Sequence, residues 1–380
     1  MARVIVCGYI VRHPVPGNAF AFFHYLLGLH RLGHEVMFFE ESGWENSCYH
    51  PGLGDFTSDP SFGLSVLRDY LNRYECPIRV GYLDRATGES YGESKADMIE
   101  FIESADLLLN IGGVCWLPEF TRARRLAFVD MDPMFMQLGK FGSEGMGHYH
   151  TYFSYGRNVG KPGCRVPTRG LDWVPLAPPV VCDLWATNDP PADGAAYTTI
   201  TNWSAYAGIE YEGERYGQKD EEFRKLIDLP KRIDVPLELA LNGGTSAERT
   251  DLRERGWRIQ DASEVGVERR PYVDFIRASR GEFSCAKNAY VKSNSGWLSD
   301  RTACYLAAGR PCVVQETGGE PITRDGTGFV TFTDETSAAE ALQQVEADYD
   351  THATAAVDVA RQHFAHDVIL PRLLNVATSD

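Results

Sequence analysis

The stretch that decides the fold is GEFSCAKNAYVKSNSGWLSDRTACYLAAGRPCVVQETGG, residues 281–319. Its pattern predicts a strand, a basic loop, a glycine-tryptophan turn, a short helix and a buried strand. Residues 301–308 have helical apolar spacing, and Gly309 ends that helix as a C-cap glycine does. Residues 311–314 form a short apolar run that begins with proline, which is typical of a strand inside a parallel sheet. The loop 315–319 then lies at the strand's carboxyl end, where open α/β sheets bind ligands.

The same alternation of strands and helices extends over most of the chain. Residues 3–9 are an apolar strand, an amphipathic helix ends at Gly33, and residues 35–39 form the next strand. Alternating strands and helices indicate a mostly parallel, doubly wound sheet. The remaining predicted strands are 105–110, 125–130, 198–203, 234–241, 256–259, 282–286, 311–314 and 329–332.

A change in composition near the middle of the chain predicts two domains. Residues 175–196 are rich in Pro, Ala, Asp and Gly, as an interdomain linker is. We therefore expect two Rossmann-like domains with a cleft between them, and a closing helical segment with a break near Pro371 that crosses back to the first domain. The boundaries are 1–182 for the N-terminal domain, 183–197 for the linker, 198–353 for the C-terminal domain and 354–380 for the helical segment.

Composition limits the classes of function. The chain has 380 residues, 43% of them hydrophobic, and a net charge of −16, which argues against an extended nucleic-acid surface. We find neither an apolar run of about 18 residues nor a signal peptide, and expect a cytoplasmic protein without a membrane span. The nine cysteines include no C-x-x-C pair, which predicts reduced thiols. The sequence gives no indication of an oligomeric state.

Two motifs carry a resemblance to a known family. The helix followed by A-x-G-x-P-V-V and a glycine loop (307–319) resembles the donor-nucleotide site of GT-B glycosyltransferases, and Leu32-Gly33-His34-Glu35-Val36 resembles the end of their first helix. The resemblance implies a GT-B type α/β fold, in which two Rossmann-like doubly wound domains face a central cleft. It also implies an acceptor-side N-terminal domain and a C-terminal domain that binds a nucleoside diphosphate sugar such as a UDP-sugar.

The predicted donor site centres on cations near a helix start. A departing diphosphate needs backbone amides and one or two cations. Lys287, Lys292 and Arg301 lie within 15 residues of one another, and Ser299 or Asp300 can cap the helix. The resemblance adds a helix-start pair, a partial W-x-P-Q motif whose Trp stacks on uracil, and the loop facing the donor sugar. The residues added are Gly17, Asn18, Gly243, Trp257, Gln260, Glu316, Thr317, Gly318 and Gly319.

On the acceptor side, His13 follows the first strand, where inverting members of the family carry a catalytic histidine. A neutral imidazole takes a proton from an acceptor hydroxyl near pH 7. Asp130 and Asp132 end another strand, and we expect them to orient His13 or to act as the base themselves. A D-x-D-P turn has a purely structural alternative. In this placement the pair binds no metal, and no cofactor is expected beyond the nucleotide-sugar co-substrate.

These residues predict a hexosyltransferase that moves a sugar from a nucleoside diphosphate to a small, partly apolar acceptor. The glutamate pair of the retaining subgroup is absent, because Gly296 and Cys304 stand at its positions, and so inverting and retaining chemistry both remain open. One alternative is a nucleotide-sugar 2-epimerase, and another is a catalytically silent GT-B binding or scaffold protein. A dehydrogenase is disfavoured, since the first strand lacks G-x-G-x-x-G.

Overall fold

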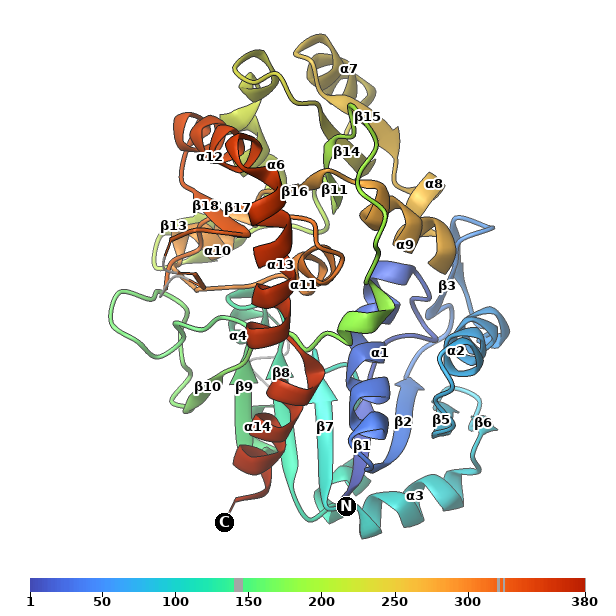
Figure 1. Ribbon diagram of the computed structural model, residues 1–380. Helices are drawn as coiled ribbons and strands as arrows, with labels where there is room; N and C mark the ends of the chain where they lie inside the picture. Colours follow the sequence, from blue (N-terminus) through green and yellow to red (C-terminus); the bar gives the residue numbers. More distant parts are fainter. Residues whose placement is uncertain (140–145, 320–321, 324, 380) are drawn as a thin grey trace. The chain divides into compact units, whose positions relative to one another are not determined.

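The computed structural model describes residues 1–139, 146–319, 322–323 and 325–379 (Figure 1). The chain forms two compact units. The N-terminal unit comprises Met1–Tyr155, Thr168–Val181 and His366–Asp380, and the C-terminal unit comprises Gly156–Pro167 and Cys182–Ala365. Each unit is built on one large sheet.

The sheet of the N-terminal unit has the strand order β10-β9-β8-β7-β1-β2-β5-β6. All neighbouring strands are parallel except β5 and β6. The chain winds outward from β1 in both directions, as in a doubly wound fold. The strands are β1 Arg3–Cys7, β2 Glu35–Ser42, β5 Arg79–Asp84, β6 Ser90–Gly92, β7 Leu107–Ile111, β8 Leu126–Asp130, β9 Thr151–Ser154 and β10 Trp173–Pro175, with a separate hairpin of β3 Cys48–His50 and β4 Asp55–Thr57.

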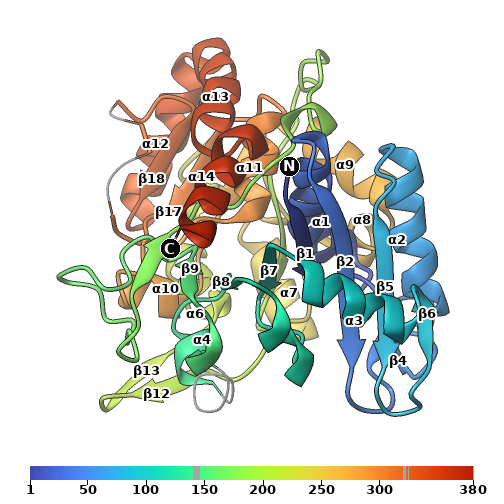
Figure 2. The ribbon, with the colours of Figure 1, turned by 90° about the horizontal axis from the view of Figure 1, so that it is seen from below.

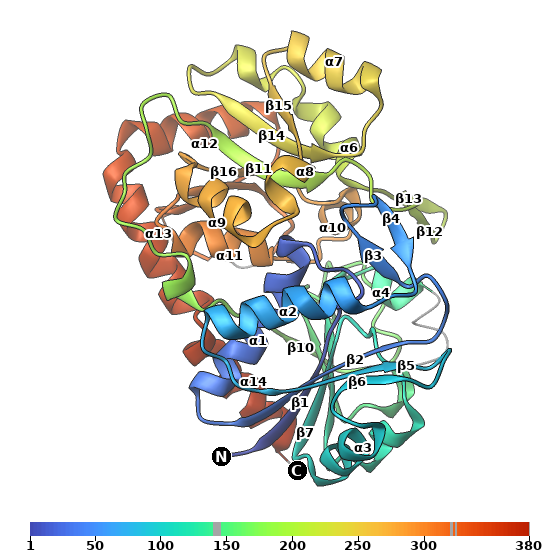
Figure 3. The same ribbon diagram turned by 90° about the vertical axis from the view of Figure 1, so that its right-hand side faces the viewer.

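Helices cover both faces of this sheet. One face buries Ile5, Met37 and Leu108 against Phe101 and Ile102 of a single helix. The first and last helices of the unit pack closely against each other (Figure 3). A Cβ added at Gly28 of the first helix would lie only 2.6 Å from Leu370 Cδ1 of the last helix. The helical segments are α1 Pro16–Arg31, α2 Ser61–Arg73, α3 Lys95–Ser104, η1 Pro118–Arg122, α4 Phe135–Leu138, η2 Met146–His148 and α14 His366–Thr378.

The sheet of the C-terminal unit has the order β15-β14-β11-β16-β17-β18, and every neighbouring pair is parallel. Numbered along the unit this is 3-2-1-4-5-6, the Rossmann order. The strands are β11 Tyr197–Asn202, β14 Leu237–Asn242, β15 Arg258–Asp261, β16 Gly281–Ser284, β17 Cys312–Gln315 and β18 Phe329–Phe332. A hairpin of β12 Ile209–Tyr211 and β13 Glu214–Tyr216 follows β11.

Helices separate these strands (Figure 2). They are η3 Cys182–Leu184, α6 Lys219–Phe223, η4 Arg224–Leu226, η5 Leu229–Lys231, α7 Ser246–Glu254, α8 Ser263–Gly266, α9 Arg269–Ala278, α10 Asn288–Lys292, α11 Asp300–Ala307, α12 Glu335–Ala347 and α13 Tyr349–His363.

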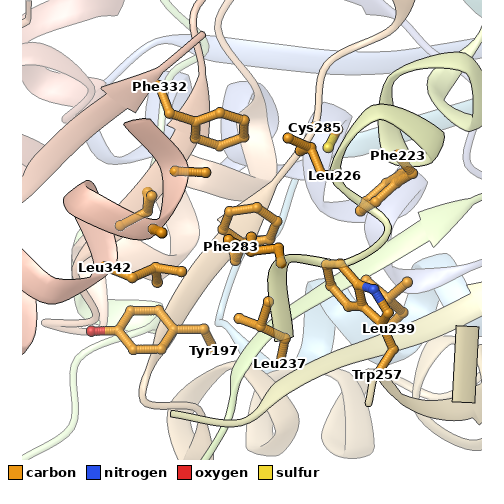
Figure 4. Packing of buried hydrophobic residues seen from close by; sticks show 14 of the residues in the cluster. Tyr197, Phe223, Leu226, Leu237, Leu239, Trp257, Phe283, Cys285, Phe332 and Leu342 are labelled. Atoms are coloured by element: carbon orange, nitrogen blue, oxygen red, sulfur yellow. The ribbon is translucent and has the colours of Figure 1, made fainter. Parts of the chain in front are cut away.

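Stacked aromatic rings form the centre of the C-terminal core (Figure 4). Phe283 of β16 and Phe332 of β18 lie with ring centroids 5.1 Å apart at an interplanar angle of 7°, and Trp257 packs against Phe283 at 6.0 Å. All three side chains are buried. Full burial of such a side chain stabilises the fold by about 1.5–3 kcal/mol, so this cluster holds the central strands at fixed positions.

The contacts place several segments differently from the predicted boundaries. Residues 156–167 belong to the C-terminal unit although they precede the predicted linker. The linker region is itself packed, since the carbonyl of Asp189 accepts a hydrogen bond from Arg310 Nη2 at 2.7 Å. The predicted break near Pro371 is wrong, because Pro371 lies inside α14 and the helices α13 and α14 separate at residues 364–365. Only α14 belongs with the N-terminal unit.

Candidate functional site

Each sheet has a point at which the strand order reverses, and loops at such points bind ligands in doubly wound folds. In the N-terminal unit this point lies between β1 and β7, and in the C-terminal unit between β11 and β16. His13 lies in the loop after β1, and Lys287 lies in the loop after β16. The two main predicted residues therefore occupy the ligand-binding position of their own sheets.

The loop after β1 is held by a buried carboxylate that the sequence analysis did not identify. Glu40 of β2 accepts hydrogen bonds from the backbone N–H groups of Ile10, Val11 and Arg12 at 2.8, 2.7 and 2.7 Å. Burial raises the pKa of Glu40 to about 7, although these three bonds and the charge of Arg12 act in the opposite direction. Three bonds to one side chain fix the backbone just before His13.

His13 lies among aromatic rings and is partly buried. Its ring centroid is 5.9 Å from that of Tyr9 and 5.2 Å from that of Tyr49. Burial lowers the pKa of His13, so its imidazole is neutral at pH 7, the form that accepts a proton. Asn18 donates to the carbonyl oxygens of Tyr9 and, at 2.8 Å, of His13. Asn18 therefore closes this loop, and Gly17 beside it is the second residue of α1.

Asp130 does not have the predicted role of orienting His13. Its carboxylate accepts hydrogen bonds from the Asp132 N–H at 2.8 Å, from Gln137 Nε2 at 2.8 Å and from Ser154 Oγ at 2.7 Å. The side chain is fully buried, and burial raises its pKa to about 6. Both oxygens are thus used to hold the turn after β8, and Asp132 lies in that turn.

In the C-terminal unit, an unpredicted cation stands next to Lys287. Lys219 is the first residue of α6 and is partly buried. Burial, together with the nearby charges of Arg301 and Lys287, lowers the pKa of Lys219 to about 7. Within the described residues, its amino group has neither a hydrogen bond nor an ion pair. The charges of Glu282 and Asp300 also act on Lys219, but it forms an ion pair with neither within the described residues. A lysine in this state is suited to bind an anion.

Lys287 itself is only partly buried and lies against two tyrosines. Its amino group donates to the hydroxyl of Tyr206 and lies 4.5 Å from the Tyr206 ring and 5.3 Å from the Tyr290 ring. Lys219 and Lys287 thus place two positive charges in the loop region after β11 and β16.

Arg301 contributes differently from the prediction. Its guanidinium donates to Glu282 Oε1 at 3.0 Å, to the carbonyl of Ile200 at 2.7 Å and to Ser284 Oγ at 2.9 Å. Glu282 is fully buried. Every nitrogen of the guanidinium is thereby engaged by β11 and β16, so Arg301 anchors α11 to the sheet and raises the local positive potential without facing a ligand directly.

The N-cap residue of α11 provides no side-chain cap, but the Asp300 carboxylate accepts hydrogen bonds from the backbone N–H groups of Asp300 and Arg301. Ser299 stands at the N-cap position but makes no capping hydrogen bond, so it does not form the predicted cap, and Asp300 is the first helical residue. Burial raises the pKa of Asp300. The positive end of a helix attracts anions. A pocket adjoins this start, and it is lined by Ser284, Cys285, Ala286, Trp297, Leu298, Ser299, Thr302, Val314, Gln315 and Phe329.

Four predicted donor residues have structural roles. Lys292 Nζ bonds Glu214 and the carbonyl of Arg215, each at 2.9 Å, and so ties α10 to the β12–β13 hairpin. Trp257 is buried in the core and donates to the Ile227 carbonyl at 2.9 Å, so it cannot stack on uracil. The other two predicted residues also form hydrogen bonds within the unit. Gln260 donates to Glu238 at 2.6 Å, and the carbonyl of Gly243 accepts from Arg249 at 3.0 Å.

The loop after β17 is tied to the turn before α11. The Gly296 N–H donates to the Thr317 carbonyl at 2.8 Å, and Thr317 Oγ1 donates to the Trp297 carbonyl at 2.9 Å. The backbone N–H of Glu316 donates a hydrogen bond to the Phe332 carbonyl, and the Glu316 residue is exposed. Gly318 and Gly319 follow with φ values of +89° and +98°. The predicted sugar-facing loop thus has a defined conformation as far as Gly319.

A second buried glutamate organises the same region. Glu222 accepts from Asn288 Nδ2 at 2.7 Å and from Gln315 Nε2 at 2.6 Å, and its exposed partner Lys225 lies at 2.6 Å. Glu222 follows Lys219 by three residues on α6, so it joins α6 to the loops after β16 and β17.

Comparisons with known proteins place this architecture. No family model matches the sequence, and no curated protein matches it. Among solved structures the chain is similar to an alpha-glucosyltransferase in complex with UDP, with a TM-score of 0.63, 11% identity and 100% of both chains covered. It is also similar to sucrose-phosphate synthase from Thermosynechococcus elongatus (TM-score 0.52, 13% identity, 98% of both chains) and to AviGT4, a glycosyltransferase involved in Avilamycin A biosynthesis (0.54, 13%, 99% and 97%).

The chain has the GT-B fold. The prediction of two Rossmann-like doubly wound domains is thereby confirmed. Over the residues that the structure describes, no helix combines the length and the apolar character that a membrane crossing requires. Nor do three or more His, Cys, Asp or Glu side chains gather in a metal-binding arrangement within those same residues.

Proposed function

We propose that the protein is a glycosyltransferase whose C-terminal unit binds a nucleoside diphosphate sugar at Lys219, Lys287 and the start of α11. The observation that carries this proposal is the unpaired, partly buried Lys219 beside two further cations. A diphosphate would supply the missing negative charge, and the positive end of α11 would add to the attraction. The similar solved structures, one of them with bound UDP, support this class of ligand.

The proposed reaction replaces one bond at the anomeric carbon. The acceptor hydroxyl oxygen forms a bond to that carbon, the bond from the carbon to the diphosphate oxygen breaks, and the nucleoside diphosphate leaves with the electron pair. Lys219 and Lys287 offset its growing charge. In an inverting course, the acceptor proton passes to the neutral imidazole of His13.

The acceptor is proposed to be small and partly apolar. Trp44, Leu53 and Phe56 are 58%, 69% and 48% exposed, and all three lie within or beside the β3–β4 hairpin. Ring contacts continue inward from Phe56 to Tyr49 at 5.4 Å and from Tyr49 to His13 at 5.2 Å. A hydroxyl held at His13 would therefore belong to a molecule whose body rests on aromatic side chains.

We infer from the distribution of charge that the acceptor is not DNA. One similar solved structure is an alpha-glucosyltransferase in complex with UDP and a DNA 13-mer. The hairpin region 42–60 of the present chain carries Glu45, Asp55 and Asp59 and no lysine or arginine, and the whole chain has a net charge of −16. Phosphate backbones require clustered cations, so a neutral or cationic acceptor is favoured over a nucleic acid.

Calorimetry with UDP and a panel of UDP-sugars tests the donor proposal. Lys219→Ala should weaken UDP binding at least tenfold, since a hydrogen bond to a charged group contributes about 1.5–3 kcal/mol. Lys231→Ala is the matched control, because Lys231 is exposed and pairs with Asp228. Absence of binding by the wild-type protein, or equal affinity in the Lys219 variant, would refute the donor site. Formation of an epimeric UDP-sugar without an acceptor would instead identify the epimerase alternative.

A further inference from the structure

Three glycines of the C-terminal unit lie against Asn158. A Cβ at Gly296 would lie 3.0 Å from Asn158 Cγ, and a Cβ at Gly319 would lie 3.1 Å from its Oδ1. A Cβ at Gly318 would first meet Asn294 Oδ1, and would lie 3.2 Å from Asn158 Nδ2. These glycines have φ values of +70°, +89° and +98°. Only glycine adopts such conformations without strain and leaves this space open. The two glycine-containing loops are therefore shaped around Asn158.

Asn158 is also bonded to the loop before α11. Its Nδ2 donates to the Asn294 carbonyl at 3.0 Å, and its backbone N–H donates to the Ser295 carbonyl at 3.0 Å. The side chain is only 6% exposed. The neighbouring Gly156 forms a bridge with Trp297. Residues 156–158 thus run alongside the 294–297 turn as a short added strand.

Asn158 contacts two loops that are separated in the sequence by α11 and β17. One is the 294–297 turn that leads into α11, and the other is the 317–319 loop that follows β17. Both loops contribute to or adjoin the pocket at the start of α11. The cations Lys219 and Lys287 stand on other segments, at the start of α6 and after β16. Asn158 is therefore placed to affect the shape of the loops without touching the cations.

We propose that Asn158 is a positioning residue for sugar transfer, which holds the 294–297 turn and the 317–319 loop in the arrangement that aligns the donor sugar. This proposal rests on the donor site assigned above. Loss of this buried side chain removes its hydrogen bond to the Asn294 carbonyl and its packing against both loops. The Gly296–Thr317 and Thr317–Trp297 hydrogen bonds must then hold the two loops without it, so their relative position becomes less exact. Misalignment of the sugar lowers the rate of transfer, whereas the diphosphate keeps its cations.

The test compares Asn158→Ala and Asn158→Asp with Lys161→Ala. Lys161 lies in the same segment and its side chain is exposed, which makes it the matched control. Asn158→Asp keeps the shape but removes the N–H donor. Turnover is followed as UDP release from the UDP-sugar that the wild type uses, and UDP affinity is measured by calorimetry. We expect Asn158→Ala to lower kcat at least tenfold, with a Kd for UDP within threefold of the wild-type value. The kcat of Asn158→Asp should lie between those of the wild type and Asn158→Ala. Lys161→Ala should match the wild type in both quantities.

A second measurement does not depend on catalysis. Hydrogen–deuterium exchange should become faster in peptides that cover residues 294–299 and 312–319 of Asn158→Ala, and should stay unchanged in Lys161→Ala. An unchanged kcat in Asn158→Ala, unchanged exchange in both peptides, or parallel losses of kcat and UDP affinity would overturn the positioning role. Failure of wild-type UDP binding with faster exchange in Asn158→Ala would overturn the donor site and with it the transfer role of Asn158.

Discussion

Arg301 Nε donates to Oε1 of Glu282 at 3.0 Å, and this ion pair is enclosed by β11 and β16 with Glu282 fully buried. Removing one partner of a buried pair leaves an uncompensated charge, which costs about 3–5 kcal/mol. Arg301→Ala should therefore lower the free energy of unfolding by about that amount in urea denaturation.

The control for this prediction is Arg270→Ala. Arg270 is 86% exposed and pairs with Asp274 one helical turn away, and such exposed pairs contribute about 0.5 kcal/mol or less. The double variant Arg301→Met with Glu282→Leu should recover most of the lost stability. A fully stable Arg301→Ala variant would show that the pair does not anchor α11.

The lowered pKa of Lys219 predicts a pH dependence of donor affinity. The pKa is about 7 in the free protein, and a bound diphosphate favours the charged lysine and raises it. Binding above pH 7 must then take up a proton, so affinity for a UDP-sugar should fall as pH rises from 7 to 9. A UDP-sugar is used because it lacks the terminal phosphate of UDP, which itself titrates near pH 6.

Calorimetry in buffers of different ionisation enthalpy measures this proton uptake. Lys219→Ala should bind more weakly at pH 7 and show a flatter pH profile. If the wild-type affinity does not change between pH 7 and 9, Lys219 does not contact the diphosphate.

The strand-end positions were predictable because topology determines them. Parallel strands bring their carboxyl ends to one edge, so a residue that follows a recognisable apolar strand, such as His13 or Lys287, can be placed without coordinates. Lys219 was missed because the β12–β13 hairpin separates it from β11 in the sequence. Asn158 was missed because residues 149–172 have no periodicity, and its role depends on contacts more than 130 positions away.

Other assignments failed because a motif does not reveal what its side chains contact. Trp257 and Gln260 have a spacing similar to a nucleotide-binding motif, but the Trp is buried in the core. Asp130 ends a strand at the expected edge of the sheet, yet its carboxylate accepts hydrogen bonds from Ser154 and Gln137. Burial of a side chain and its hydrogen-bond partners depend on segments distant in sequence, which the local pattern does not specify.

Metal removal is expected to leave transfer largely unchanged. In the proposed site the diphosphate is neutralised by lysines and helix amides, and the Asp130 carboxylate is engaged by the turn after β8. Activity should be measured after EDTA treatment and again after addition of Mg²⁺ or Mn²⁺. Complete loss with EDTA, reversed by either ion, would contradict a metal-independent mechanism.

Glu40→Gln should disturb the loop that carries His13. The amide of glutamine offers one acceptor and one donor where Glu40 accepts three backbone N–H groups, so at least one of those groups loses its partner. The loss of a charged hydrogen bond costs about 1.5–3 kcal/mol, which urea denaturation measures. Glu45→Gln, at an exposed position nearby, is the control and should be neutral. Equal stability of the two variants would contradict the fixing role of Glu40.

His13 is predicted to act as the general base, and two measurements test it. Removal of a general base lowers turnover by about 10²–10⁴, so His13→Ala should lose at least that factor while UDP affinity stays within threefold. Burial lowers the pKa of His13, so the neutral form persists below the ordinary value of about 6.5. The acid-side fall in wild-type turnover should therefore be centred below that ordinary value. Asn18→Ala, which frees the His13 carbonyl without removing the imidazole, should keep this acid limb at reduced turnover. If His13→Ala retains most of its turnover, the base lies elsewhere or transfer proceeds with retention.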